Sequence, residues 1–100
     1  MSMAQLVAAG APELPEGWFY RVESAMWRGA IRVIIRRPKL IGSKEVERSV
    51  IFVHEHADEL AAVVSGCRHA HRRWQEREES RVLADRAREY YGDHDPKGGR

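Results

Sequence analysis

A long helix-compatible segment near the C-terminus, residues 54–91, limits the fold more than any other feature. It contains no proline, and Gly92 follows it as a natural helix-ending residue. As one helix the segment would be about 57 Å long, whereas strands of the length expected here reach about 20–30 Å. The distal part, residues 75–91, must therefore project, fold back after a break, or pack on another chain.

The residues before this segment alternate between apolar and polar side chains, as strands with one face in water do. Strands are expected over residues 18–24, 28–36 and 46–53, with a hairpin connection at residues 24–29 and a turn punctuated by Pro38 and Gly42. The pattern predicts an α+β fold, a three-stranded antiparallel sheet packed on one long C-terminal helix. A break near residue 80 is the alternative, because Ser80 is able to cap a second helix.

The core is expected between the sheet and the first half of the helix. In the third strand the pattern leaves open whether Val50 and Phe52 or Ile51 and Val53 face the core. The helix face is set by three- and four-residue steps through Leu60, Val63, Val64, Cys67, His71 and Trp74. The expected core side chains are Trp18, Tyr20, Val22, Ile31, Val33, Ile35, Leu60, Val63, Val64 and Cys67. Leu60→Ala is accordingly expected to cost about 2–5 kcal/mol.

Three parts of the chain are expected. The stretch "APELPEG" holds two prolines and a glycine, so residues 1–16 are expected to be a flexible segment. Residues 17–91 form the single βββα domain, and residues 92–100 a disordered tail. Gly66 costs about 1 kcal/mol in a helix relative to alanine, which predicts a close packing contact there.

Composition argues for a small protein of the cytoplasm. The net charge of +2 is too balanced to indicate nucleic-acid binding without a local basic patch. The 14 arginines against three lysines suggest a GC-rich genome, such as that of an actinobacterium or its phage. A single cysteine, Cys67, fits a reducing compartment. The N-terminal residues lack the basic start of a signal peptide, and no apolar run is long enough to span a membrane.

Arginines gather on one face of the expected sheet. If the first two strands pair with their apolar sets together, Arg21, Arg28, Arg32 and Arg36 share the side opposite the core. Arg48 joins them in one register of the third strand, and Glu47 in the other. Such a face is either a solvated surface shielded by arginine stems or a site for phosphates or an acidic protein. Neutralisation by Glu23, Glu45 and Glu47 would weaken the nucleic-acid interpretation.

The stretches "WRGAIRV" and "VERSVIFVHEHADELAAVV" resemble the arm-type DNA-binding domain of phage tyrosine integrases and the plant AP2 domain. The likeness lies in a tryptophan–arginine strand and a phenylalanine that precedes the helix. It implies three strands plus a helix, and a sheet face that enters the DNA major groove through Arg21, Arg28, Arg32 and Arg36. Val53 and His54 stand where that family usually has a threonine or serine cap.

No cofactor, metal or catalytic site is expected. His54 and His56 lie too far along the chain to join Cys67 and His71 as zinc ligands in one protomer. A Cys67–His71 dyad would need an exposed thiolate, whereas Cys67 lies on the apolar helix face. No phosphate-binding glycine loop or nucleophile elbow is present in the sequence.

The expected function is therefore that of a small, non-catalytic regulatory protein. The first hypothesis is nucleic-acid binding through the arginine face, with Arg21, Arg28, Arg32, Arg36 and Arg48 as contacts. The alternative is a protein–protein module, for example a phage protein docking on a host factor. A homodimer is expected in either case, through an apolar stripe of Trp74, Val82, Leu83, Ala87 and Tyr90.

Overall fold

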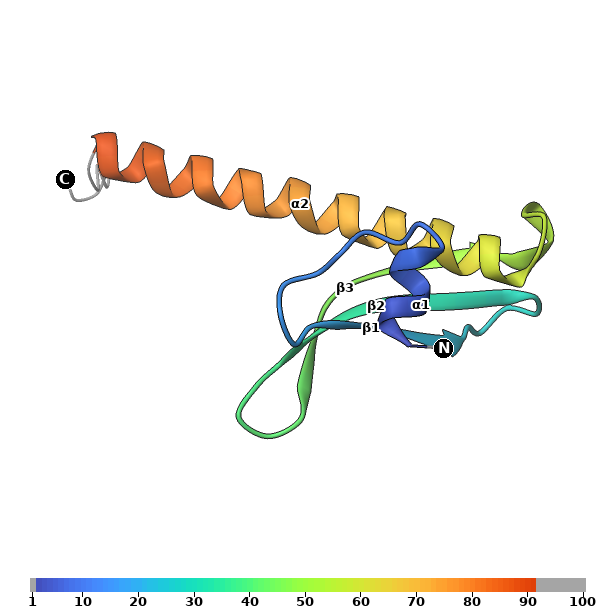
Figure 1. Ribbon diagram of the computed structural model, residues 1–100. Helices are drawn as coiled ribbons and strands as arrows, with labels where there is room; N and C mark the ends of the chain where they lie inside the picture. Colours follow the sequence, from blue (N-terminus) through green and yellow to red (C-terminus); the bar gives the residue numbers. More distant parts are fainter. Residues whose placement is uncertain (1, 92–100) are drawn as a thin grey trace.

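The computed structural model of the protein describes residues 2–91 (Figure 1). It confirms a three-stranded antiparallel sheet packed on one long C-terminal helix. The elements in chain order are α1 (Met3–Ala8), β1 (Phe19–Ser24), β2 (Ala30–Pro38), β3 (Ser43–Phe52), the short 3-10 helix η1 (Val53–Glu55) and α2 (Glu59–Tyr91). The tail at residues 92–100, expected to be disordered, lies outside the described residues.

The sheet has the order β1-β2-β3, so β2 is the central strand. Its register turns Ile51, which pairs with Ile31, toward α2 and leaves Val50 on the opposite face. This settles the choice that the sequence left open for the third strand. A shift follows Ile35, which pairs with Glu47 while Arg36 pairs with Glu45, so Val46 is the extra residue of a bulge.

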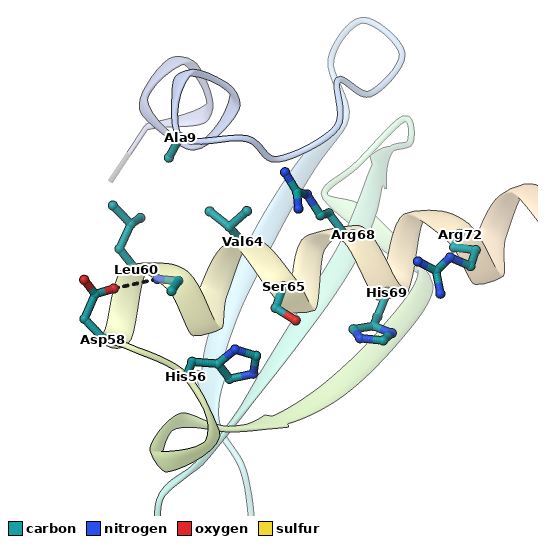
Figure 2. A pocket seen from close by; sticks show the side chains of 10 residues that line it. Ala9, His56, Asp58, Leu60, Val64, Ser65, Arg68, His69 and Arg72 are labelled. Atoms are coloured by element: carbon teal, nitrogen blue, oxygen red, sulfur yellow. Dashed lines mark hydrogen bonds between the residues drawn. The ribbon is translucent and has the colours of Figure 1, made fainter.

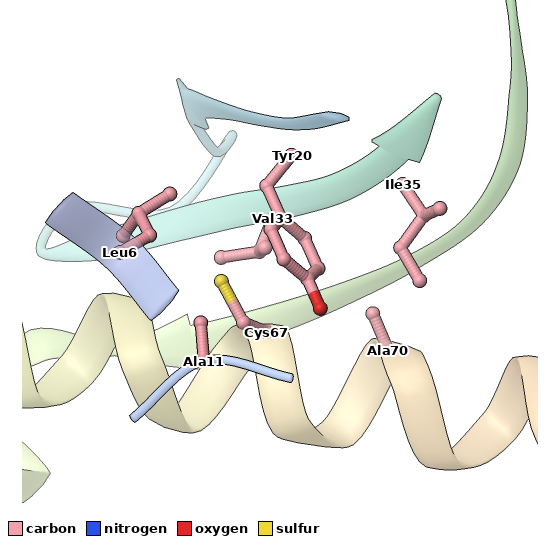
Figure 3. Packing of buried hydrophobic residues seen from close by; sticks show 7 residues of the cluster. All are labelled: Leu6, Ala11, Tyr20, Val33, Ile35, Cys67 and Ala70. Carbon is pink, nitrogen blue, oxygen red and sulfur yellow. The ribbon is translucent and has the colours of Figure 1, made fainter. Parts of the chain in front are cut away.

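The core lies between the sheet and the first half of α2, and small residues let the two approach closely. Figure 3 shows side chains of the sheet, of α2 and of the N-terminal segment meeting there. Its buried members are Leu6, Ala11, Tyr20, Val33, Ile35, Cys67 and Ala70. A Cβ at Gly66 would lie 2.5 Å from Val33 Cγ2, which confirms the predicted close contact. The Ser49 hydroxyl donates to the Gly66 carbonyl at 3.0 Å, so the backbone of α2 itself touches β3.

The prediction of the core is wrong for two residues, Leu60 and Val22. Leu60 is 40% exposed because it lies at the start of α2 and points about 160° away from Ala62 and about 120° away from Gly66, which are buried. Val22 is also largely exposed, since it lies on the edge strand β1 while α2 covers β2 and β3. The stability loss of a core substitution is therefore no longer expected for Leu60→Ala. Trp18, Ile31 and Val63 pack at the margin of the core, half-buried.

The N-terminal segment packs on the domain, in contrast to the flexible segment that the sequence led us to expect. Ser2 and Gln5 form a capping box at the start of α1, with the Ser2 hydroxyl accepting from the Gln5 amide. Leu6 then enters the core. The Tyr20 hydroxyl donates to the Pro12 carbonyl at 2.7 Å, and Arg68 donates to the Gly10 carbonyl. These bonds hold residues 2–12 against β1 and α2.

The helix α2 is continuous over 33 residues, with no break at Ser80. At about 50 Å it outruns the sheet, and its distal half projects past the strands (Figure 1). All residues from Glu79 to Tyr90 are exposed. Ion pairs of Arg81 with Glu78 and Asp85, and of Arg88 with Asp85, run along this part and support the exposed helix.

Candidate nucleic-acid interface

Four arginines lie on the face of the sheet turned away from α2. The register places Arg21, Ile34 and Arg48 in one row across the three strands, because Ile34 pairs with both. Arg32 and Arg36 lie on β2 in the neighbouring rows, on the same side by the two-residue period of a strand. The expected convergence of Arg21, Arg32, Arg36 and Arg48 on one face is thus what the register gives. We call these four residues the arginine face.

Ile34 lies at the centre of the arginine face and is only 2% exposed, although no helix covers this side. Its cross-strand neighbours on this face are Arg21 and Arg48, and Arg32 and Arg36 lie two residues away on β2. Long charged side chains commonly cover apolar surface in this way with their aliphatic parts.

Two glutamates partly neutralise the arginine face. Glu23 accepts from Arg32 at 3.2 Å and lies 3.9 Å from Arg21, so two arginines share one carboxylate. Glu45 forms a two-bond pair with Arg48, at 2.7 and 2.8 Å. These bonds lower the pKa of Glu45, whose charge is thereby kept in place. Arg36 instead donates to the Ser43 hydroxyl and carbonyl, at 2.7 and 2.9 Å.

Glu47 does not belong to the arginine face. It lies on the opposite side of β3, nearly buried under α2, where Arg73 and Arg77 contact its carboxylate at 3.4 and 2.7 Å. Arg77 also donates to the Val46 carbonyl at the bulge. Glu47 therefore anchors α2 just before it leaves the sheet. Four arginines against Glu23 and Glu45 leave the arginine face with an excess of two positive charges.

The hairpin ends extend this positive charge. Across residues 18–53 there are eight basic and three acidic residues, and one of the three is Glu47. The basic ones are Arg21, Arg28, Arg32, Arg36, Arg37, Lys39, Lys44 and Arg48. Arg28 was expected on the central strand, but β2 begins at Ala30, so Arg28 lies exposed in the β1–β2 turn beside Gly29. The turn at Gly29 has φ of 77°, which explains why the strand starts later.

A second candidate site is an open groove of about 640 Å³ along the first half of α2. Figure 2 shows Arg68 and Ala9 on one side of the helix and His56 and His69 on the other. Arg68 is bonded to the Gly10 carbonyl, and Asp58 caps α2 by accepting from the Ala61 amide at 2.8 Å. Two of the charged groups that line the groove, Arg68 and Asp58, thus serve the fold.

Cys67 and His71, which the sequence sets side by side on the helix, differ in their surroundings. Cys67 is fully buried, and burial raises the pKa of its thiol to about 12. His71 meets the edge of Trp74 at 5.5 Å between ring centroids, and burial lowers the pKa of its imidazole. Within residues 2–91, no three histidine, cysteine or acidic side chains are placed to hold a metal ion. Cys67 is thus part of the core, whereas His71 is half-buried and packs on Trp74.

The expected dimer stripe divides into two parts. Trp74 is half-buried and packs against Trp18 with the ring centroids 5.2 Å apart and the rings tilted by 47°, so it belongs to the chain's own core margin. Val82, Leu83, Ala87 and Tyr90 remain exposed on the projecting part of α2. Leu83 is 62% exposed and points about 140° away from Ala70. The stripe therefore lies on the side of α2 opposite the sheet.

The sequence pattern did not predict one pair of exposed apolar residues. Leu40 and Ile41, at the tip of the β2–β3 hairpin, are 99% and 83% exposed. For the stretch "RPKLIGSKE" the sequence predicts only a turn between strands, punctuated by Pro38 and Gly42. The available signal was two large apolar residues at a position where turns usually carry glycine, proline, asparagine or aspartate.

The chain matches no protein-family model, no curated protein and no solved structure. Among residues 2–91 no helix is both long and apolar enough to cross a lipid bilayer. Any function must therefore be argued from the surfaces just described: the arginine face, the projecting stripe and the hairpin tip.

Proposed function

We propose that the protein is a non-catalytic nucleic-acid-binding protein of regulatory type, and that duplex DNA lies against its arginine face. The observation that carries the proposal is the concentration of charge on the sheet. Residues 18–53 hold eight basic residues and three acidic ones, and only Glu23 and Glu45 share the side of the arginines. Phosphate groups bind where such a local excess is held on a rigid surface.

The two ion pairs on the face are compatible with this function. Exposed pairs of this kind contribute only about 0–1 kcal/mol, so a phosphate can replace a carboxylate as the partner of an arginine. Arg21 and Arg32 share Glu23, and one of them gains a full partner when a phosphate binds. Arg36 donates to Ser43 and, among residues 2–91, forms no ion pair with a carboxylate, although Glu45 is near enough for its charge to interact with that of Arg36.

We expect duplex binding that weakens steeply with salt. Fluorescence anisotropy with labelled duplex and single-stranded oligonucleotides over a salt series measures it. The triple variant Arg21→Ala/Arg32→Ala/Arg48→Ala should lower affinity for all sequences, and each lost phosphate contact should reduce the slope of log affinity against log salt by about one. Arg72→Ala is the matched control, since Arg72 is exposed on α2 away from the sheet. Absence of binding at low salt, or a triple variant that binds like the control, would overturn the proposal.

We further propose that the projecting stripe binds a second copy of the chain. A shallow groove of about 410 Å³ there is lined by Glu78, Glu79, Val82, Leu83 and Arg86. The charges of this groove match those of the same groove on a second copy. A twofold axis between Val82 and Leu83 places Glu79 of one chain opposite Arg86 of the other. Such a patch that meets itself is the usual basis of a homodimer.

Charge reversal tests this pairing by sedimentation or light scattering at tens of micromolar. Glu79→Arg should weaken the dimer, because it sets two positive charges opposite each other. The double variant Glu79→Arg/Arg86→Glu should restore it. Leu83→Asp should give monomers, whereas Leu60→Asp, at an exposed site near the start of α2, should not. A monomeric wild-type chain, or a double variant as weak as the single one, would contradict the arrangement.

A further inference from the structure

The β2–β3 hairpin carries two apolar side chains with no role in the fold. The Lys39 amide donates to the Gly42 carbonyl at 3.1 Å and closes the turn, which leaves Leu40 and Ile41 at its centre. Gly42 has φ of 76°, while the two apolar residues keep negative φ values. Their exposure of 99% and 83% means that neither side chain packs on its own chain. The turn itself would form equally well with polar residues at both positions.

This hairpin end is a braced, two-stranded ribbon. The pairing of β1 with β2 ends at Phe19 and Arg36, so residues 37–44 continue beyond β1 as β2 and β3 alone (Figure 1). At its base, Arg36 bridges to Ser43 with two hydrogen bonds. Gly17 lies close beneath Pro38, where an added Cβ would be 3.3 Å from Pro38 Cγ. The tip is therefore held in a defined direction.

The surroundings of the tip are basic. From Arg36 to Lys44, both included, there are four basic residues and no acidic one. Lys39 and Lys44 are exposed directly beside the turn. Charge of this sign next to exposed leucine and isoleucine indicates a partner with an anionic surface and an apolar layer behind it. The stacked bases of duplex DNA, with phosphates on both sides, have this composition.

We propose that Leu40 and Ile41 act as a wedge that enters the minor groove of duplex DNA and partly unstacks one base step, while Lys39 and Lys44 contact the flanking phosphates. Apolar side chains used in this way kink DNA by about 20–90°. The inference rests on the proposed DNA-binding function, and it adds a deformation to it. Three of the four residues of the arginine face, Arg32, Arg36 and Arg48, lie on the same two strands, β2 and β3, and hold the phosphate backbone next to the step that opens.

Because pyrimidine–purine steps unstack most easily, we expect the bend to depend on the base step. Energy transfer between dyes at the two ends of a duplex of about 30 base pairs reports the bend. Full-length protein should raise the transfer more on a duplex with a central TA step than on a GC-rich one. Leu40→Ser/Ile41→Ser should bind with an unchanged salt slope and no longer raise the transfer. Met26→Ser, at the exposed tip of the other hairpin, should bind and bend like the wild type.

The outcomes separate the two proposals. Binding without a change in energy transfer, or a bend that survives Leu40→Ser/Ile41→Ser, overturns the wedge and leaves the DNA-binding function standing. A chain that binds no duplex at low salt overturns both. Anionic phosphatidylserine vesicles form a further arm: tip-dependent vesicle binding by a chain that does not bend DNA would assign the tip to a lipid surface and overturn the wedge.

Discussion

Replacing Ile35 with alanine should lower the free energy of unfolding by about 2–5 kcal/mol, as large-to-small changes at fully buried sites do. Ile35 has no exposed surface, and Figure 3 shows it directed at α2 near Ala70. The chain cannot easily close the cavity, because Val33 beside it is fully buried as well. In a domain of this size the melting temperature should fall by at least about 8 °C.

The matched control is Leu60→Ala, which removes a similar side chain from an exposed position. We expect it to cost about 0.5 kcal/mol, typical of surface changes. Urea unfolding followed by circular dichroism compares the two variants on one scale. Equal losses in the two would mean that α2 is rotated relative to the sheet and that Leu60 is part of the core after all.

Gly66→Ala should destabilise the protein even though alanine is the better helix former. The gain in helix propensity is about 1 kcal/mol. The opposing effect is a steric clash. The new Cβ would lie 2.5 Å from Val33 Cγ2 and 3.1 Å from Ile51 Cγ1, and Val33 has little room to move because it is fully buried. Overpacking of this kind costs about 1–3 kcal/mol, and contact distances this short favour the upper part of that range, which leaves a net loss of up to about 2 kcal/mol.

Ser65→Ala, one position earlier on α2 and only half-buried, separates propensity from packing. It should leave stability unchanged or raise it by a few tenths of a kcal/mol. The urea midpoints of the two variants give the comparison. If Gly66→Ala were as stable as Ser65→Ala, the helix would have to lie further from β2 than the Gly66 contact requires.

The order of elements was predictable because the hydrophobic period changes once along the chain. Alternation before residue 54 predicts strands, and three- and four-residue steps after it predict a helix. The third strand's register was not predictable, because Glu47 and Ser49 face α2 and blur the alternation there. Both are satisfied by distant partners: Glu47 by Arg73 and Arg77, and Ser49 by the Gly66 carbonyl. Such long-range partners leave no local trace in the sequence.

For a related reason, the sequence pattern predicts a buried helix face that extends too far toward Leu60. Large apolar residues marked the face in the sequence, whereas Ala62, Gly66 and Ala70 form its fully buried centre. Small residues allow α2 to approach the sheet, but a pattern based on large side chains overlooks them. The packing of the N-terminal segment on the domain was not predicted. The prolines of residues 11–17 indicate a break in regular structure, and nothing in the pattern indicates that Leu6 and Ala11 reach the core.

The candidate site was predicted in part. Arg21, Arg32 and Arg36 follow from alternation once the first two strands pair, whereas Arg48 joins them only in one of the two registers that the sequence leaves open for the third strand. Arg28 was misplaced because the start of β2 is decided by the turn at Gly29 and not by polarity. The tip residues Leu40 and Ile41 were passed over because their exposure depends on the hairpin geometry.

The position of the projecting stripe decides which way two joined chains would face. Leu83 and Tyr90 point about 140–160° away from Ala70, so a partner bound there lies on the back of α2. Each sheet then sits on the far side of its own helix, and the two arginine faces look outward in opposite directions. Dimers that read two half-sites of one duplex present both binding elements to the same side. A dimer of this chain would instead hold two separate stretches of DNA and bridge them across the width of its paired helices.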